Sequence, residues 1–180
     1  VEDMMKLQGD NYNLKAAESL PTFLSQLDTT SFTAEERVVY NALKSWDHFN
    51  TAESEAASYY EAWWDKLMPM IWDEMAKDDA VLQRPTTYNT IKLIKERPDL
   101  SFFDIQETTE KETAKEILQL SFKAGVQDII DWKKSHPTNS LVEWGTFKDS
   151  YIGHLLRIQP FNIPVKHGGN HDIVNAHGGE

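Results

Sequence analysis

Apolar side chains recur at intervals of three and four residues along most of the chain, which predicts a largely helical protein. The clearest stripe follows Thr33-Ala34-Glu35-Glu36. This tetrapeptide is a capping box, in which the threonine and the last glutamate each satisfy a free backbone N–H group. It predicts a helix over residues 34–46. A longer pattern over residues 52–76 predicts a second helical stretch, with a kink or two abutting helices at Pro69, because proline removes one backbone hydrogen bond.

The first 27 residues carry a weaker helical pattern. Acidic residues stand in the first turn of residues 1–8, where the helix dipole favours them, and Gly9 interrupts the pattern. Apolar spacing resumes over residues 20–27. Pro21 is expected in the first turn of a new helix or at a kink, since either position tolerates the loss of its N–H group.

Two further helices are predicted in the second half of the chain. Thr86 or Thr87 caps a short helix that ends before Pro98. A second capping box, Thr109-Glu110-Lys111-Glu112, opens a long helix. Pro137 stops that helix, and the basic residues just before it favour a helix C-terminus.

The last 40 residues lose the helical period. Residues 141–144 read as a short apolar turn or strand, and residues 148–158 as a helix or an extended segment. Residues 172–176, after Gly168-Gly169, read as a short strand. One or two short strands do not make a stable sheet, so this strand requires partners from elsewhere. We therefore expect a mainly α chain, with a helical region at residues 1–140 and a truncated, Gly-rich, strand-like tail at residues 141–180.

Composition and charge exclude several classes of protein. The aromatic share is 11% and includes six Trp, which is typical of a folded core. The formal net charge is −11, so the surface repels phosphate backbones and nucleic acid is not expected as a partner. The absence of Cys excludes disulfides, thiol catalysis and Cys-ligated zinc. No apolar run approaches the roughly 18–20 residues that span a bilayer, so no membrane partner is expected.

A cluster of potential metal ligands stands near the end of the chain: His167, His171, Asp172, His177 and Glu180. Histidines four residues apart suit one metal ion when they lie on a helix, but Gly168-Gly169 opposes a helix here. On a strand, residues four apart lie about 13 Å from each other, which is too far for one ion. We therefore interpret this segment as a Gly-rich turn with polar residues at a strand edge, and assign no metal site.

An aromatic stripe, Tyr59, Tyr60, Trp63 and Trp64, lies at helical spacing in the predicted long helix. Such a stripe either lines a pocket for an acyl group or forms core. We favour the core, because apolar helix faces are buried by default.

Two acidic pairs, Glu35/Glu36 and Asp78/Asp79, resemble the paired carboxylates of acid catalysis. Adjacent acids on a helix do not face each other. The first pair is better explained by a helix start, and the second by a solvated linker over residues 77–84. Neither a G-x-S-x-G elbow nor a Gly-rich phosphate loop occurs. The residues by themselves thus indicate a helical domain without a complete active site.

Three stretches, in order along the chain, carry a resemblance to a known family. They are Val1–Asp10 followed by Leu20-Pro21 and Leu24; Leu43–Asp47 followed by Ala56-Ala57 and Trp63; and Trp144-Gly145 followed by His154-Leu155, Gly168-Gly169 and Val174-Asn175-Ala176. Together they resemble the middle-to-late part of the large β chain of penicillin acylases, which are N-terminal-nucleophile hydrolases. Gly9 departs from that pattern, because the family more usually has an apolar or small polar residue there.

This resemblance implies a fragment of an αββα enzyme that cleaves the amide bond of N-acyl substrates of the β-lactam or acyl-homoserine-lactone type. An N-terminal Ser, exposed by self-cleavage, would attack the amide with its own amine as base. That Ser, the oxyanion Asn and the calcium-binding acids are expected upstream of Val1, and a further family motif is expected beyond Glu180. We therefore assign no catalytic, cofactor-binding or metal-binding residue to this chain, and expect calcium only in the complete enzyme.

The expected partner is the remainder of the parent protein, and the family implies a periplasmic or extracytoplasmic location. Apolar surface left exposed in such a piece predicts a dimer. The alternative is a stand-alone helical module that binds a ligand or a protein through the aromatic stripe, without catalysis. Burial of Tyr59, Tyr60, Trp63 and Trp64 would exclude that groove.

Overall fold

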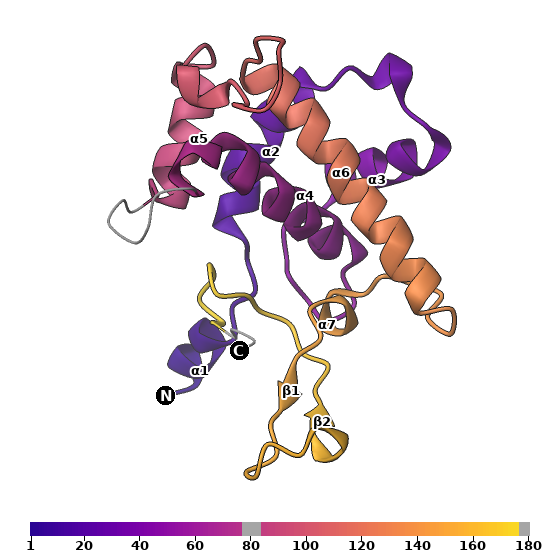
Figure 1. Cartoon of the computed structure of the whole chain (residues 1–180). Coiled ribbons are helices and arrows are strands. Elements are labelled where there is room, and N and C mark those ends of the chain that lie inside the picture. Colours follow the sequence, from indigo (N-terminus) through magenta and orange to yellow (C-terminus); the bar gives the residue numbers. More distant parts are fainter. Residues whose placement is uncertain (77–83, 177–180) are drawn as a thin grey trace.

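A computed structural model describes residues 1–76 and 84–176. Five helices make up the main body (Figure 1). They are α2 (Leu14–Gln26), α3 (Ala34–Ser45), α4 (Glu55–Ile71), α5 (Thr87–Glu96) and α6 (Ala114–Ser135). Helix α4 runs through the middle and packs mainly along α6, and it also contacts α3. The chain is therefore mainly helical, as the apolar spacing predicts.

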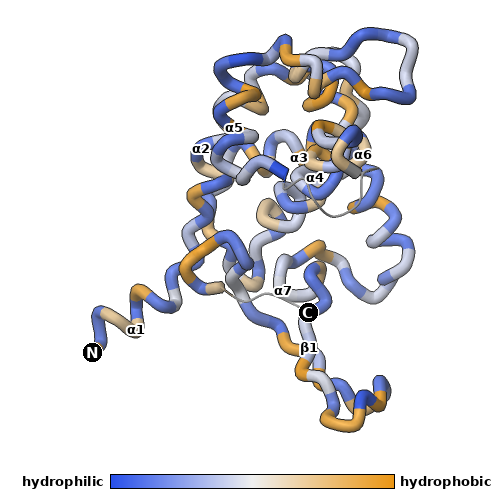
Figure 2. Tube along the Cα trace, turned by 60° about the vertical axis from the view of Figure 1, so that its left-hand side comes forward, coloured by the Kyte–Doolittle hydropathy of each residue, from blue (hydrophilic) through white to orange (hydrophobic). Residues whose placement is uncertain are grey.

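Shorter elements connect and extend this body. They are α1 (Glu2–Gln8), α7 (Trp144–Phe147), the 3₁₀ turns η1 (Thr29–Ser31), η2 (Asp73–Ala76), η3 (Ser101–Phe103) and η4 (Gln159–Phe161), and the strands β1 (Tyr151–Ile152) and β2 (Ile163–Pro164). The two strands pair antiparallel, with Tyr151 opposite Pro164 and Ile152 opposite Ile163. Helix α1 and this hairpin project in different directions from the foot of the molecule (Figures 1 and 2).

The core is built around the aromatic stripe of α4. The Trp63 ring lies 5.6 Å from Phe23 of α2 and 5.1 Å from Phe122 of α6, centroid to centroid. Its indole Nε1 donates to the Ser121 hydroxyl at 3.0 Å, so the only polar atom of the ring is satisfied. Gly125 lets the two helices approach closely, because a Cβ at that position would lie 2.8 Å from the Cα of Trp63.

Several sequence predictions are confirmed. The capping box of Thr33 and Glu36 is formed at the start of α3. The Thr86 side chain caps α5, which ends at Glu96, before Pro98. The aromatic stripe from Tyr59 to Trp64 is buried in the core.

The structure places both interior prolines inside helices. Pro21 lies within α2, not at a helix start, and Pro69 lies within the last turn of α4. Helix α4 ends at Ile71, and a 3₁₀ turn then covers residues 73–76. The predicted helix over residues 52–76 is therefore shorter and changes type shortly after its proline, which removes one backbone donor.

The predicted capping box at Thr109–Glu112 is wrong. The box that opens α6 is formed by Thr113 and Glu116. Glu112 is buried and holds the preceding loop, because its carboxylate accepts from the Ile105 N–H at 3.2 Å and from the Thr108 hydroxyl at 2.8 Å. A carboxylate occupied in this way cannot cap the helix, and the helix therefore starts one turn later.

The strand predicted at residues 172–176 is also wrong. These residues form turns and bends. The Asn170 N–H donates to the Asn175 carbonyl at 3.2 Å, and the Asn175 N–H donates to the Asp10 carbonyl at 2.9 Å. Gly169 has φ 86°, a left-handed value that favours glycine. The tail therefore curls back onto the N-terminal segment, and the short strands lie earlier, within residues 148–164.

Within residues 1–76 and 84–176, no helix is long and apolar enough to cross a membrane.

Candidate functional site

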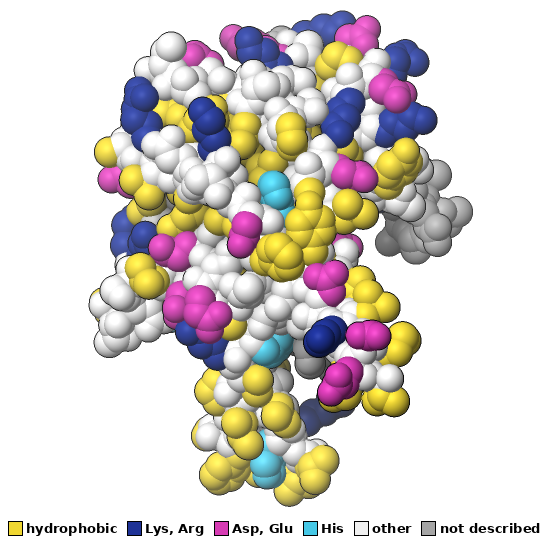
Figure 3. Space-filling view, turned by 180° about the vertical axis from the view of Figure 1, so that it is seen from behind, with side chains coloured by type: hydrophobic (Ala, Val, Ile, Leu, Met, Phe, Trp, Pro, Cys, Tyr) yellow, Lys and Arg dark blue, Asp and Glu magenta, His cyan; other side chains and the backbone are white. Residues whose placement is uncertain are grey.

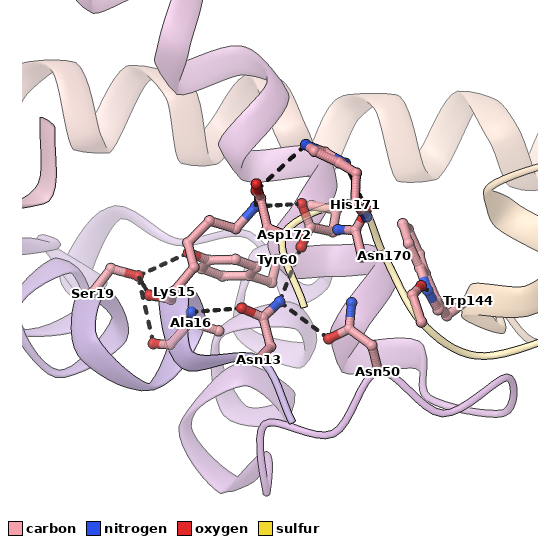
Figure 4. Close-up of polar contacts among 12 residues, drawn as sticks. Asn13, Lys15, Ala16, Ser19, Asn50, Tyr60, Trp144, Asn170, His171 and Asp172 are labelled. Atoms are coloured by element: carbon pink, nitrogen blue, oxygen red, sulfur yellow. Dashed lines mark hydrogen bonds and ion pairs between the residues drawn. The ribbon is translucent and has the colours of Figure 1, made fainter. Parts of the chain in front are cut away.

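A cluster of buried polar side chains lies where the start of α2, the loop before α4, α4 itself and the C-terminal tail meet (Figure 4). We call it the polar junction, and it consists of Asn13, Lys15, Asn50, Glu61, Asn170 and Asp172. The first two residues belong to the start of α2, Glu61 to α4, and the last two to the C-terminal tail. Five of the six are buried, and Asp172 stands at the edge. The junction is therefore tertiary, because no local segment of the chain contains it.

Asn13 organises the inner half of the polar junction. Its Oδ1 accepts from the Ala16 N–H at 2.9 Å and so caps α2. Its Nδ2 donates to the Glu61 carboxylate and to the Asn50 Oδ1, both at 3.1 Å. One fully buried amide thus ties a helix start to α4 and to the loop that carries Asn50.

Lys15 joins the inner half to the tail. Its ammonium lies 2.9 Å from the Glu61 Oε2 and 2.9 Å from the Asp172 Oδ2. The same ammonium lies 4.9 Å from the centroid of the Trp64 ring and 5.4 Å from that of Tyr60. Its charge is therefore balanced by two carboxylates and two aromatic faces, as a buried lysine requires.

The tail is fixed to the junction by backbone groups as well. The Gly169 N–H donates to the Asn50 carbonyl at 2.9 Å, and the Trp144 indole donates to the Gly169 carbonyl at 2.7 Å. The Asn175 Nδ2 donates to the Asn11 Oδ1 at 2.8 Å. Residues 168–175 are thus held on both the N-terminal segment and the loop before α4.

Two hydroxyls next to the polar junction, those of Ser19 and Tyr60, do not form a nucleophile with its base. The Ser19 hydroxyl donates to the Lys15 carbonyl at 2.8 Å and lies 2.9 Å from the Tyr60 hydroxyl. Burial raises the pKa of Tyr60 well above its ordinary value, and the nearby Glu61 carboxylate raises it further. Tyr60 therefore stays protonated at neutral pH and is not a base for Ser19.

One serine outside the junction contacts a histidine ring. The Ser135 Oγ lies 3.0 Å from the His136 Nδ1, at the exposed end of α6. Both groups also reach the Trp132 carbonyl, at 2.9 Å and 3.0 Å. Because that carbonyl accepts their protons, the contact closes a helix end and does not activate a nucleophile.

Lys148 is a second cation that contacts the tail, and its side chain is half-buried. Its ammonium lies 2.9 Å from the His167 Nδ1 and donates to the carbonyls of Gly168 at 2.9 Å and Gly169 at 3.3 Å. Burial lowers the pKa of Lys148 to about 8. No carboxylate lies within 4.0 Å of it among the described residues, so the Gly-rich turn holds this amine through two backbone carbonyls and the His167 ring.

The structure separates the histidines considered as metal ligands. His167 lies beside Lys148, whereas the His171 ring is 3.4 Å from the Asp172 carboxylate. Within the described residues, no group of three His, Asp or Glu gathers closely enough to hold an ion. His177, Glu180, Asp78 and Asp79 lie outside the described residues. Glu35 and Glu36 lie at the start of α3, where Glu36 forms the cap.

The sequence interpretation missed Lys15, Asn13 and Asn50. A signal for Lys15 exists, since Lys15, Ser19 and Phe23 follow each other at four-residue spacing. That spacing puts a lysine on the same helix face as a core phenylalanine, and a charge on a buried face requires a partner. No comparable signal marks Asn50, because its loop has no period.

The polar junction is a structural clasp in which Asn13, Lys15, Glu61 and Asp172 are joined by hydrogen bonds and ion pairs, while the buried Nδ2 atoms of Asn50 and Asn170 have no hydrogen-bond partner among the described residues. It presents no nucleophile with a base. No curated protein matches this chain. The family model described as penicillin amidase matches residues 1–180, the whole sequence. The chain therefore belongs to the penicillin amidase family, which gives it an amidohydrolase-type function.

Proposed function

We propose that this chain is the helical scaffold of a penicillin-amidase-type hydrolase that cleaves the amide bond of N-acyl substrates, of the β-lactam or acyl-homoserine-lactone type. The observation that carries the proposal is the family match over residues 1–180, together with the arrangement of Ser19 and Ser135, whose hydroxyls donate to backbone carbonyls. The nucleophile in this proposal is an N-terminal Ser supplied by a part of the enzyme other than these residues.

The reaction is acyl transfer to water. The Ser hydroxyl attacks the amide carbonyl while its own α-amine takes the proton, and the amine leaves with a proton. Water then hydrolyses the acyl-enzyme and releases the carboxylic acid. Donors aimed at the carbonyl oxygen stabilise the charge that develops there. The role proposed for the present chain is to hold the surrounding helices and the tail in place.

The partner in this proposal is the remainder of the parent enzyme, and the proposed location is extracytoplasmic. Calcium is proposed only for other parts of that enzyme. Within residues 1–76 and 84–176, no three acidic or histidine side chains fit one ion, so no step is assigned to a metal here.

The alternative function, a stand-alone module that binds a ligand along the aromatic stripe, lacks its groove. Tyr59, Tyr60, Trp63 and Trp64 are all buried. The Trp64 ring packs on Tyr60 and Phe23, and the Trp63 ring packs on Phe122. A ligand could reach them only by displacing the core.

The test compares this chain with the full-length product of its gene. Both are assayed on a chromogenic phenylacetyl amide and on an acyl-homoserine lactone. The full-length protein is expected to hydrolyse at least one of them, and the chain alone neither. Turnover by the chain alone that is abolished by Ser19→Ala or Ser135→Ala, with folding intact by circular dichroism, would overturn the proposal.

A further inference from the structure

The segment after the Gly-rich turn, residues 170–176, closes one side of the polar junction, and we call it the strap. Polar contacts join it to the rest of the described chain. The Asp172 carboxylate lies 2.9 Å from the Lys15 ammonium. The Asn175 N–H donates to the Asp10 carbonyl at 2.9 Å, and the Asn175 Nδ2 donates to the Asn11 side chain at 2.8 Å.

Little apolar surface supports the strap. Ile173 is its one buried apolar side chain, and it is not part of the continuous core of the helices. The neighbouring hairpin gives the strap no apolar cover, because the large apolar side chains of the hairpin are exposed. Figure 3 shows hydrophobic side chains gathered on the surface of that hairpin. Since apolar burial provides most of the stability of a fold, the strap is docked less strongly than the helices are packed.

The closed strap also buries a donor that has no acceptor. Asn170 is 6% exposed, and its Oδ1 accepts from the His171 N–H at 2.7 Å. The other atom of the amide is therefore Nδ2, which has no hydrogen-bond partner among the described residues. Burial of such a donor is unfavourable, whereas water satisfies it once the strap opens. This amide therefore weakens the closed position.

The base of the strap is anchored by hydrogen bonds that do not involve residues 170–176. The Gly169 N–H donates to the Asn50 carbonyl at 2.9 Å, and the Gly169 carbonyl accepts from the Trp144 indole at 2.7 Å. The Lys148 ammonium donates to the Gly168 carbonyl at 2.9 Å. Gly169 has φ 86°, and a glycine at this position can take up the change in backbone angles that a hinge requires.

We propose that residues 170–176 open as one unit about Gly168-Gly169 while the helices stay folded, and that the Lys15–Asp172 ion pair holds them closed. Within the strap, the Asn170 N–H donates to the Asn175 carbonyl at 3.2 Å, so the segment moves as a closed turn. Opening admits solvent to Lys15 and to its second partner, Glu61. All of these contacts lie within this chain, so the strap does not depend on the proposed function.

Single cysteines measure the opening, because the chain has no Cys of its own. Ile173→Cys places a buried thiol in the strap, Val174→Cys an exposed one, and Val126→Cys a buried one in α6. The rates of reaction with Ellman's reagent are compared at one fixed pH. Ile173→Cys should react about ten-fold or more slower than Val174→Cys, and roughly a hundred-fold or more faster than Val126→Cys, whose thiol requires opening of the helices.

Both limiting results would overturn the proposal. Equal rates for Ile173→Cys and Val126→Cys would mean that the strap opens only when the whole fold opens. Equal rates for Ile173→Cys and Val174→Cys would mean that the strap is not docked. Amide hydrogen exchange of the unmodified chain supplies a second measurement, in which the Asn175 N–H should exchange faster than the Gly169 N–H. Equal protection of these two amides would contradict a hinge at Gly168-Gly169.

The ion pair is tested in the Ile173→Cys background. Asp172→Asn should raise the labelling rate about five-fold, the effect of one partly exposed ion pair. The matched control, Asp128→Asn, breaks the exposed Lys66–Asp128 pair and should leave the rate unchanged. If Asp172→Asn has no effect, or if both variants raise the rate equally, the Lys15–Asp172 pair does not hold the strap.

Asn170→Leu, in the same background, tests the buried amide. Leucine has a similar size and no donor, and the exposed His171 N–H can turn to water, so the labelling rate should fall about three- to five-fold. Far-UV circular dichroism checks the folding of every variant. A higher rate in Asn170→Leu would show that this amide holds the strap closed, contrary to the role inferred for it.

Discussion

Replacing Lys15 by Met tests whether the polar junction holds the tail and the helices together. Met has a similar length and an unbranched chain, so it fills the same space without the charge. The Glu61 side chain, only 6% exposed, then loses its cationic partner and keeps one amide donor, Asn13. The Asp172 side chain is 26% exposed and is partly solvated when its partner is removed.

These exposures set the size of the effect. Removing one partner from a buried ion pair costs about 3–5 kcal/mol, because the other charge stays buried. An exposed pair contributes at most about 1 kcal/mol. We therefore expect Lys15→Met to lower the free energy of unfolding by about 4 kcal/mol, and Asp172→Asn by about 1 kcal/mol. For a chain of this length the first loss corresponds to a decrease in Tm of roughly 10 °C.

Urea and thermal unfolding followed by far-UV circular dichroism measure both losses. The decisive control is the double variant Lys15→Met with Glu61→Gln. It removes the buried charge and leaves an oxygen for Asn13, so most of the lost stability should return. If the double variant is no more stable than Lys15→Met alone, the cost does not come from an unpaired carboxylate, and the reasoning is refuted.

Three other perturbations follow from single contacts. Gly125→Ala places a methyl group against the backbone of α4, and should lower Tm by roughly 5 °C, since overpacking of about 1–3 kcal/mol exceeds the gain in helix propensity. Gly153→Ala should leave Tm unchanged, because its methyl group would meet only the Tyr151 ring, at 3.9 Å. Thr113→Ala removes the cap of α6 and should cost about 1 kcal/mol in urea unfolding, whereas Thr109→Ala should cost under about 0.5 kcal/mol. Lys148 has its pKa lowered to about 8, so the unfolded chain binds more protons between pH 8 and the ordinary lysine pKa. Stability should therefore rise with pH across that window, by about 1–2 kcal/mol after allowance for solvent screening, relative to Lys148→Met.

Each of these expectations has a contrary outcome. An unchanged Tm for Gly125→Ala would mean that α4 and α6 do not cross as closely as described. Equal losses of stability for the two threonine variants would mean that Thr113 is not the only cap of α6 and that the helix start predicted at Thr109 also contributes. A difference in stability between wild type and Lys148→Met that does not vary with pH would mean that the Lys148 amine is solvated in the folded state.

The helices were largely predictable because their signals are local. A capping box acts within four residues, and an apolar stripe is visible in any window of two or three turns. Thr33 and Glu36 therefore located α3, and Pro98 marked the end of α5. Thr109 misled for a related reason. The spacing of a capping box is necessary but not sufficient. The Glu112 carboxylate accepts from the Ile105 N–H and the Thr108 hydroxyl, so Thr113 and not Thr109 serves as the cap.

The sequence by itself determined that the chain is helical, acidic and without cysteine, and its three ordered stretches were sufficient to indicate the penicillin amidase family. Only the tertiary structure decided the path of the tail and the polar junction. Lys15 and Asp172 are separated by 157 residues, and no local pattern encodes their contact. The tail resembles a strand by composition, yet strand formation requires a neighbouring strand, and the groups that meet it here are those of Asp10, Asn11 and Asn50. Those groups form hydrogen bonds with isolated backbone and side-chain groups of the tail. They do not offer the continuous row of backbone groups that a strand needs, and the tail therefore forms a turn.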